Sequence, residues 1–334
     1  MIEVKNLVKR YGDHYAVDHL SFTVEDGQIF GFLGPNGAGK STTMNMMTGY
    51  LAATEGQVLV EGHDILEEPE AARENIGYLP ELPPLYPDMT VTEYLRFCAE
   101  LKKVPKEQRE EQLQQVLTLT HLEDMSSRLI RNLSKGYRQR VGLAQAILGF
   151  PKIIILDEPT VGLDPKQVVE IRDLIRQLAK DHTVILSSHI LSEIRAVCDH
   201  VLIIRKGKFV VCDTPEDLEE KLSAGGSLEL AAKASPEEAA AVLDRVSGVT
   251  AHTLLGQTED ASRFSVAMDG DVREALFYAF AEAKLPLLEL RPRMASLEEV
   301  FLDLTDENDA VAARAAALFH TQEREEASGD DSHL

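Results

Sequence analysis

Short apolar runs separated by turn residues fill the first sixty positions of the chain. Runs of this kind occupy residues 2–4, 21–24, 29–33 and 58–60, and Asp26-Gly27 precedes the third of them. Apolar or alternating segments of this length, bounded by turn residues, predict β-strands. The glycine-rich segment after residue 33 leads into a stretch that we expect to be helical.

Between residues 83 and 149 the pattern becomes helical. Thr90 and Glu93 form the Thr-x-x-Glu pattern of a capping box ahead of apolar residues at helical spacing. Pro105 suits the first turn of a second helix, because the amide that proline lacks has no partner there. We therefore expect residues 83–149 to form a helical subdomain inserted into the fold.

Two aliphatic runs after this block, residues 152–156 and 183–186, predict strands that are buried on both faces. Between them, Asp164-Pro165 predicts the start of a helix whose apolar residues lie on one face. Residues 201–211 predict a hairpin. The alternation of strands and helices indicates an α/β fold with a largely parallel sheet.

The chain changes character after residue 223, where an Ala-Gly-Gly segment is expected to be a linker. The pattern beyond it predicts strand, helix, strand, strand, helix and strand at residues 227–234, 236–246, 249–256, 262–268, 271–284 and 286–292. This order matches the split β-α-β arrangement of small α+β, ferredoxin-like modules. A further helix is expected at 296–304, and the acidic segment 310–334 is expected to be disordered.

We therefore expect a first domain at residues 1–222, an accessory α+β domain at 227–305 and an acidic tail at 310–334. The accessory domain allows two interpretations. It is either separable, acting in regulation or in steadying a dimer, or a stabilising cap with Val300 and Phe301 packed on the first domain.

The charge balance argues against nucleic acid as a partner. Lys and Arg total 34 against 56 Asp and Glu, a formal net charge of −22, and phosphate contacts dominate nucleic-acid affinity. The first twelve residues lack the apolar segment of a signal peptide, and the most apolar stretch, residues 141–156, is too short to span a bilayer. We therefore expect any membrane role to come through a partner. The three widely spaced cysteines predict reduced thiols and no metal site.

A phosphate-binding loop follows the third predicted strand. The pattern G-x-x-x-x-G-K-[ST] is matched by Gly34, Pro35, Asn36, Gly37, Ala38, Gly39, Lys40 and Ser41. With Thr42 this segment opens a predicted helix, whose N-terminus adds partial positive charge. Lys40 would supply a point charge to the β and γ phosphates, and the Ser41 hydroxyl can ligate Mg²⁺.

The second half of the site lies elsewhere in the chain. Asp157 and Glu158 end a buried strand, where Asp157 suits Mg²⁺ and Glu158 can orient the attacking water or accept its proton. Ser134 and Gly136 predict a second helix start that is able to bind an anion. An ordinary capped helix is the alternative interpretation of that segment.

Together these residues resemble the ABC ATPase family, over roughly residues 1–220. The resemblance implies a P-loop NTPase core of the ABC type. Lys40 and its loop match the Walker A motif, and Asp157 with Glu158 matches Walker B and its catalytic glutamate. Ser134 and Gly136 match the family signature.

Three further residues take their roles only from this resemblance. Asp164 matches the D-loop, His189 the switch histidine at the γ-phosphate, and Tyr11 the aromatic that stacks on adenine. The alternatives are an N-cap for Asp164, a capped loop residue for His189 and a core aromatic for Tyr11.

The sequence departs from the family pattern at three positions. Lys135 and Tyr137 replace the usual Gly and Gln of the signature, and Glu81 occupies the place of the Q-loop glutamine. A carboxylate at Glu81 can still reach Mg²⁺, but it adds negative charge near the γ-phosphate. A surface glutamate is the alternative interpretation.

This variant set, with residues 296–301, resembles the ATPases of ABC-2-type exporters. The resemblance implies ATP and Mg²⁺ as cofactors, a head-to-tail homodimer or heterodimer with another ATPase subunit, and an integral-membrane permease. It places the subunit at the cytoplasmic face of the cell membrane. A non-transport ABC ATPase with a regulatory role is the alternative. A GTPase or small-molecule kinase is disfavoured because the chain has no guanine-reading Asn-Lys-x-Asp motif and because such enzymes have no use for the signature at Ser134. The transported substrate stays open.

Overall fold

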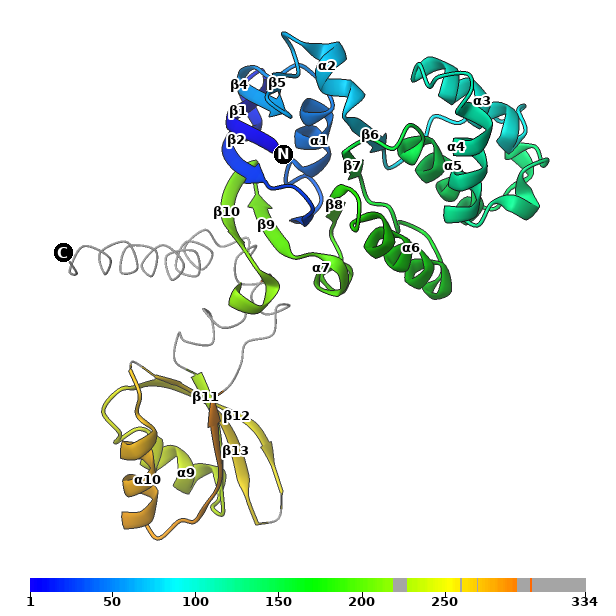
Figure 1. The fold of residues 1–334 in the computed structure, drawn as a ribbon. Coiled ribbons are helices and arrows are strands. Elements are labelled where there is room, and N and C mark those ends of the chain that lie inside the picture. Colours follow the sequence, from blue (N-terminus) through cyan, green and yellow to red (C-terminus); the bar gives the residue numbers. More distant parts are fainter. Residues whose placement is uncertain (219–226, 259, 269, 293–300, 302–334) are drawn as a thin grey trace, which may run out of the picture. The chain divides into compact units, whose positions relative to one another are not determined.

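The computed structural model describes residues 1–218, 227–258, 260–268, 270–292 and Phe301. The chain divides into two compact units, Met1–Pro215 and Glu216–Leu334, and each is described here by itself (Figure 1). The predicted domain bounds at 222 and 305, the predicted helix at 296–304 apart from Phe301, and the predicted tail at 310–334 lie outside the described residues.

A four-stranded antiparallel sheet opens the first unit, in the order β2-β1-β4-β5. Its strands are β1 (Ile2–Tyr11), β2 (His14–Val24), β4 (Glu55–Val60) and β5 (His63–Asp64). β1 and β2 are longer than predicted, because exposed polar residues interrupt their apolar pattern without ending the hydrogen-bonded ladder.

A six-stranded sheet carries the order β10-β9-β3-β8-β7-β6. Its strands are β3 (Ile29–Leu33), β6 (Ile76–Leu79), β7 (Ile153–Leu156), β8 (Thr183–Ser188), β9 (His200–Arg205) and β10 (Lys208–Asp213). Neighbours are parallel except in the β9–β10 hairpin. β7 and β8 are buried throughout, as their aliphatic runs predict, and β3 is buried as well. The carboxyl ends of the parallel strands therefore meet at one edge, where ligands bind in open α/β sheets.

Seven α-helices and two short 3-10 helices, Glu123–Met125 and Ile130–Asn132, accompany these sheets within the described part of the first unit up to Val197. The α-helices are α1 (Lys40–Met47), α2 (Pro69–Glu74), α3 (Val91–Leu101), α4 (Arg109–Leu119), α5 (Lys135–Ile147), α6 (Pro165–Leu178) and α7 (Leu191–Val197). In Figure 1, α3, α4 and α5 gather beside the sheets as a helical subdomain within the predicted range 83–149.

The predicted helix starts have different outcomes. The capping box of Thr90 and Glu93 is confirmed at the start of α3, and the start at Asp164-Pro165 is confirmed in α6. The start at Pro105 is wrong, because α4 begins at Arg109. A turn closed by the Gln108 amide on the Pro105 carbonyl at 2.9 Å precedes that helix.

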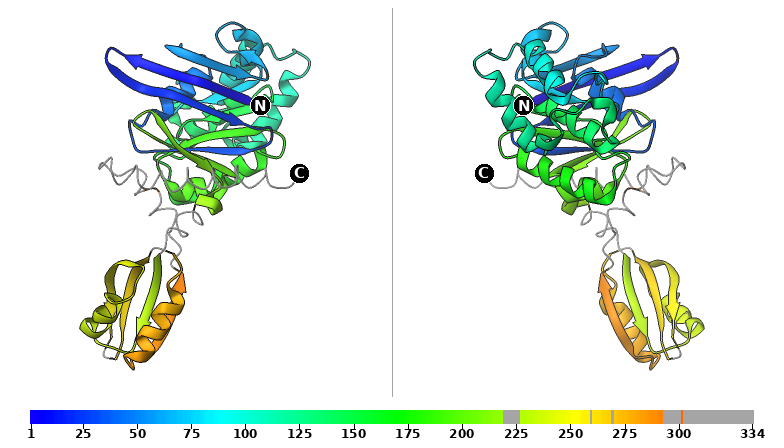
Figure 2. Two further views of the ribbon diagram at one scale, coloured as in Figure 1. Left: turned by 90° about the vertical axis from the view of Figure 1, so that its left-hand side faces the viewer. Right: turned by 90° about the vertical axis from the view of Figure 1, so that its right-hand side faces the viewer.

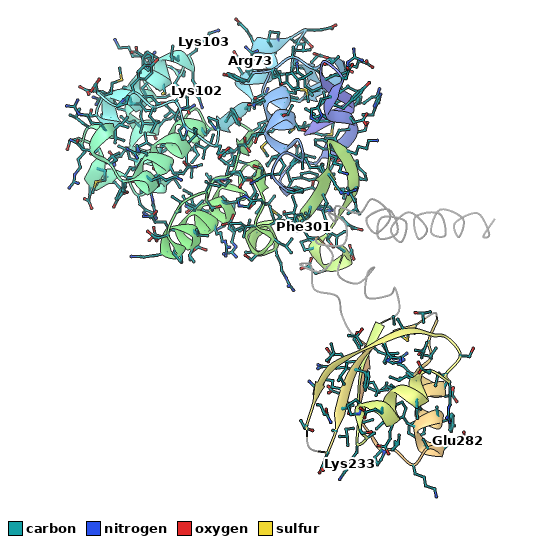
Figure 3. All side chains as sticks on the ribbon, turned by 180° about the vertical axis from the view of Figure 1, so that it is seen from behind. Arg73, Lys102, Lys103, Lys233, Glu282 and Phe301 are labelled. Atoms are coloured by element: carbon teal, nitrogen blue, oxygen red, sulfur yellow. The ribbon has the colours of Figure 1, made fainter. Side chains whose placement is uncertain are left out.

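Two lysines after α3 make one contact within the helical subdomain and one with α2 (Figure 3). Lys102 Nζ donates to two backbone carbonyl oxygens at the end of α5, at 2.9 and 2.7 Å. Burial lowers the pKa of the Lys102 ammonium to about 8. Lys103 Nζ lies 3.4 Å from a carboxylate oxygen of Glu70 in α2, and Figure 3 shows both lysines near Arg73. These residues border a cavity of about 300 Å³ between the subdomain and α2.

The second unit has its own sheet and core (Figure 2). Its elements are β11 (Ser227–Ala232), α9 (Pro236–Leu243), β12 (Val249–Gln257), β13 (Ser262–Met268), α10 (Arg273–Glu282) and β14 (Leu287–Pro292). The predicted strand and helix order is therefore confirmed. The sheet is antiparallel, in the order β12-β13-β11-β14, and both helices supply residues to one apolar cluster.

We find no helix among the described residues with the length and apolar character that a membrane span requires.

Candidate active site

The loop between β3 and α1 closes around the side chain of Lys40. Lys40 Nζ donates to the carbonyl oxygen of Gly34 at 2.7 Å and lies 3.4 Å from that of Pro35. Gly39 has φ 106°, and a Cβ there would lie 2.5 Å from the carbonyl oxygen of Ala16, so only glycine fits. Because α1 begins at Lys40, the loop leads directly into a helix N-terminus, an arrangement suited to binding phosphate.

Asp157 follows β7 and lies beside Ser41 of α1. Ser41 Oγ donates to Asp157 Oδ1 at 3.2 Å, and Ser187 Oγ of β8 donates to the same oxygen at 2.6 Å. Burial raises the pKa of the Asp157 carboxyl, and the two hydroxyl bonds partly offset that rise because they stabilise the ionised form. Two elements, α1 and β8, thus place hydroxyl groups beside one buried carboxylate.

Glu158 connects Lys40 with His189. Its Oε1 lies 3.4 Å from Lys40 Nζ, and its Oε2 lies 2.9 Å from His189 Nδ1. The Glu158 backbone has φ 48°, a left-handed conformation that residues other than glycine rarely adopt. Strain of this kind persists where the surrounding structure enforces it, and here the Glu158 amide donates to Ser187 Oγ at 2.8 Å.

These groups open into one cavity of about 440 Å³. It is lined by Ala16, Asn36, Gly37, Ala38, Gly39, Lys40, Ser41, Thr42, Glu81, Glu158, Val161 and His189. The phosphate loop and the end of β7 therefore meet as their sequence order predicts. Asp157 lies behind this lining, buried against Ser41 and Ser187.

Glu81 forms a wall between two cavities. It lines the phosphate-loop cavity and also a second cavity of about 400 Å³, which lies between the segment after β6 and the start of α5. Lys135, Arg138 and the buried Gln139 line the second cavity, so cationic side chains of α5 face the space beyond Glu81.

The signature residues lie at helix starts away from this cavity. Ser134 caps α5, and its Oγ accepts from the Tyr137 amide at 3.4 Å. Asp164 caps α6, where its Oδ1 accepts from the Gln167 amide at 3.0 Å. A Cβ on Gly136 would lie 2.2 Å from Gln167 Oε1, so the two helix starts pack tightly together. Within one chain, none of these predicted residues lines the phosphate-loop cavity.

Tyr11 lies at the end of β1, and the residue is 54% exposed. Lys9 Nζ lies 5.2 Å from the ring centroid, and the ring does not line the phosphate-loop cavity. The alternative of a core aromatic is wrong, because the ring is open to solvent.

The sequence did not predict the role of the Ser187 side chain, whose hydroxyl donates to Asp157 and accepts from the Glu158 amide. It also missed Ala16 and Val161 in the lining. A signal for Ser187 was present, because two consecutive serines end a strand that is otherwise aliphatic. A buried hydroxyl needs a partner, and the carboxylates that follow the neighbouring strand are the nearest candidates.

Residues 17–161 match the family model described as ABC transporter. An uncharacterised ABC transporter ATP-binding protein of Bacillus subtilis (strain 168) is 36% identical over 92% of this chain and 96% of its own length. The chain belongs to the ABC transporter ATP-binding proteins. The linearmycin resistance ATP-binding protein of the same strain is 32% identical over 91% of this chain and 98% of its own length. The bacitracin transport ATP-binding protein of Bacillus licheniformis is 40% identical over 63% of this chain and 68% of its own length.

Solved structures of ABC ATPases share the fold of the first unit. An ATP-binding subunit of an ABC transporter is 30% identical, with a TM-score of 0.62 over 66% of this chain and 93% of that one. A dimeric ATP-binding cassette in a post-hydrolysis state bound to ADP and phosphate is 26% identical, with a TM-score of 0.59 over 64% of this chain and 98% of that one. This ABC transporter subunit therefore binds and hydrolyses ATP, and the regulatory, non-transport alternative is not favoured.

Proposed function

We propose that this subunit powers export through a separate integral-membrane permease, by closing with a second ATPase subunit around Mg²⁺-bound ATP. The observation that carries the proposal is the set of contacts joining Lys40, Glu158 and His189, next to Ser41 and Asp157. Docked to its permease, the subunit would lie at the cytoplasmic face of the membrane. Names of relatives such as the bacitracin transport protein support a transport role, and the substrate of this chain is left unassigned.

The residues around Asp157 fit a magnesium ion. Mg²⁺ prefers oxygen ligands and is commonly held by one or two carboxylates together with phosphate oxygens. Ser41 and Asp157 bring a hydroxyl and a carboxylate oxygen within 3.2 Å of each other at the edge of the phosphate loop. Glu81, which lines the same cavity, would add a third oxygen ligand. When bound, the ion would neutralise charge on the phosphates.

We assign Glu158 to the attacking water, which it orients or deprotonates. Its carboxylate is buried and is held on both sides by Lys40 and His189, so its direction is fixed before nucleotide arrives. Lys40 would exchange this carboxylate for the β and γ phosphates. His189, still exposed at the cavity, would contact the γ-phosphate and keep Glu158 aligned.

We assign Ser134, Gly136 and Asp164 to the nucleotide of the opposite subunit. Ser134 and Asp164 are exposed at helix starts, and none of the three residues lines the phosphate-loop cavity of its own chain, which supports a contact with a partner's nucleotide. Tyr11 is assigned to adenine stacking, which its exposed ring allows.

Contact with the permease is assigned to the helical subdomain. Glu81 separates the nucleotide cavity from the cationic cavity at the start of α5, so a change at the nucleotide reaches the subdomain through one side chain. The cavity bordered by Arg73, Lys102 and Lys103 lies between that subdomain and α2 and is a second candidate surface for the permease.

Steady-state hydrolysis of Mg²⁺-ATP tests the residue assignments. Glu158→Gln should lower kcat by about 10² to 10³, because a preorganised charge is lost, while ATP binding is retained. Lys40→Ala should lower kcat and weaken ATP binding as well. Glu110→Gln, which removes an exposed carboxylate paired with Arg96, is the matched control and should leave kcat unchanged. Wild-type turnover by Glu158→Gln would show that the assignment is wrong.

A further inference from the structure

A buried carboxylate outside the set assigned above lies in the first turn of α7. Glu193 is 6% exposed, and its Oε2 accepts hydrogen bonds from Thr160 Oγ1 at 2.5 Å and Ser188 Oγ at 3.0 Å. Among the residues that the structure describes, no cationic side chain lies within ion-pair distance of it. Its desolvation is therefore compensated by two hydroxyl donors and by the start of α7 rather than by an opposite charge.

The two hydroxyl groups belong to the two segments that border the reacting end of the cavity. Ser188 is the last residue of β8 and directly precedes His189, and its Oγ also accepts from the Ile190 amide at 2.9 Å. Thr160 precedes Val161, which lines the cavity, in the segment that runs to the Asp164 cap of α6. One carboxylate oxygen thus joins two segments that are far apart in the sequence.

The two neighbouring serines at the end of β8 contact different carboxylates. Ser187 reaches Asp157 and the Glu158 amide, while Ser188 reaches Glu193. The end of β8 is therefore bonded on one side to the catalytic carboxylates and on the other to Glu193. Breaking the second set of bonds would leave Asp157 and Glu158 in place and would release only the segments that follow them.

We propose that Glu193 is a positioning residue for hydrolysis. It holds His189 and the segment from Thr160 to Asp164 in one fixed arrangement around Glu158. His189, which contacts the γ-phosphate, and Asp164, which contacts the opposite subunit, therefore move together. The proposal rests on the hydrolytic roles assigned to Glu158 and His189. An apolar side chain would fill the same space with a smaller desolvation cost, but it would bond neither hydroxyl.

The expected signature is a loss of turnover without a loss of nucleotide affinity. Misplacement of catalytic groups by about 1 Å can cost about 10²-fold in rate. Glu193→Ala should lower kcat by about 10- to 100-fold and change the Kd for ATP by less than about twofold. None of the groups that contact the phosphate loop is altered by this substitution.

The partner hydroxyl gives a milder and independent test. Thr160→Val removes the hydroxyl and keeps the volume, so kcat should fall by roughly threefold to tenfold, because Glu193 loses one hydroxyl contact and keeps the contact with Ser188. Thr160→Ser keeps the hydroxyl and should retain most of the wild-type kcat. Thr160→Val in the Glu193→Ala background should cost less than it does alone, because its partner is already absent.

Two parallel measurements separate the possible explanations. Asp199→Ala removes a carboxylate that accepts from the Ile29 amide at 2.8 Å, at the start of β3 away from the site, so it should lower the melting temperature and leave kcat unchanged. Glu158→Gln is assayed in the same series, and wild-type turnover there would reject the proposed function itself rather than the role of Glu193.

With Glu158→Gln inactive, three results would overturn the inference. The first is a kcat of Glu193→Ala within about twofold of the wild-type value. The second is an equal loss of kcat in Thr160→Val and Thr160→Ser. The third is a fall in the kcat of Glu193→Ala that is matched by an equal loss of ATP affinity. If Glu193→Ala does not fold, the comparison of Thr160→Val with Thr160→Ser decides alone.

Discussion

At the residue scale, three carboxylates near one cavity differ in what surrounds them. Asp157 is buried and accepts from two hydroxyl groups, which suits a metal ligand. Glu158 lies between Lys40 and His189 in a left-handed backbone conformation, which suits a group that must point at water. Glu81 lies at a wall shared by two cavities, which suits a sensor. Environment, rather than residue type, separates the three assigned roles.

Glu81→Gln and Glu81→Ala test the sensor role. Unit charges about 4 Å apart interact by roughly 4 kcal/mol at an effective dielectric of 20, and Mg²⁺ would offset much of this. We therefore expect Glu81→Gln to change the Kd for ATP only modestly and to reduce transport more than it reduces hydrolysis. The comparison needs the ATPase reconstituted with its permease. Transport by Glu81→Ala at the wild-type rate would mean that Glu81 is a bystander.

At the element scale, the helical subdomain is fastened by its helix ends. Lys102 after α3 donates to the carbonyl groups that end α5, and Lys103 reaches α2. The first of these contacts places an ammonium group where the partial negative charge of a helix C-terminus favours it, although burial opposes the charge.

The pKa of Lys102 predicts a pH dependence of stability. Because its pKa is lowered from 10.5 to about 8, the unfolded chain binds more protons than the folded protein between these values. The burial penalty is complete below about pH 8 and is relieved as the pH rises toward 10.5. Relative to Lys102→Met, the wild type should therefore gain up to about 3 kcal/mol in unfolding free energy across this window.

Urea unfolding of both proteins at several pH values from about 7.5 to 10.5 measures this difference. Other groups titrate in the same range, but they do so in both proteins and cancel in the comparison. A constant difference between the two unfolding free energies would show that Lys102 is not held in a penalised charged state.

The sequence predicts elements of this fold better than it predicts contacts between them. Continuous aliphatic runs identify β7 and β8, and the Thr90 and Glu93 pair identifies the start of α3, because these signals are local. The phosphate loop and its meeting with Asp157 also follow from motif order. The bond from Ser187 to Asp157 joins residues 30 positions apart, and no local pattern encodes such a pairing.

Two other features show the same limit. Pro105 is compatible with a helix start, but a turn closed by the Gln108 amide on the Pro105 carbonyl precedes α4, which begins at Arg109. Glu193 reads as an ordinary acidic residue in the first turn of a helix, and only the fold reveals that it is buried between two hydroxyl groups.

At the scale of the whole molecule, the two units have separate apolar cores. One cluster lies in the first unit, and a second cluster, from Leu228 to Phe280, lies in the C-terminal unit. All residues assigned to nucleotide lie in the first unit. A small module with its own core is able to fold independently, so we propose that it is separable from hydrolysis.

Truncation of the chain after Leu222 tests that separation. The shortened protein should remain soluble and bind ATP with near-normal affinity, as judged by equilibrium titration with nucleotide. An insoluble product, or one that does not bind ATP, would favour the alternative in which residues near Val300 and Phe301 stabilise the first domain.

We propose that two such subunits enclose ATP head to tail, and the mass of Glu158→Gln in solution tests this arrangement most directly. With hydrolysis blocked, ATP should persist at the interface, because Ser134 and Gly136 of the opposite subunit contact its γ-phosphate. Light scattering should therefore give a dimer in saturating ATP and a monomer in ADP. Ser134→Arg, which places bulk and charge at the capped start of α5, should abolish the dimer. A Glu158→Gln protein that has the same monomeric mass in ATP and in ADP would contradict the account.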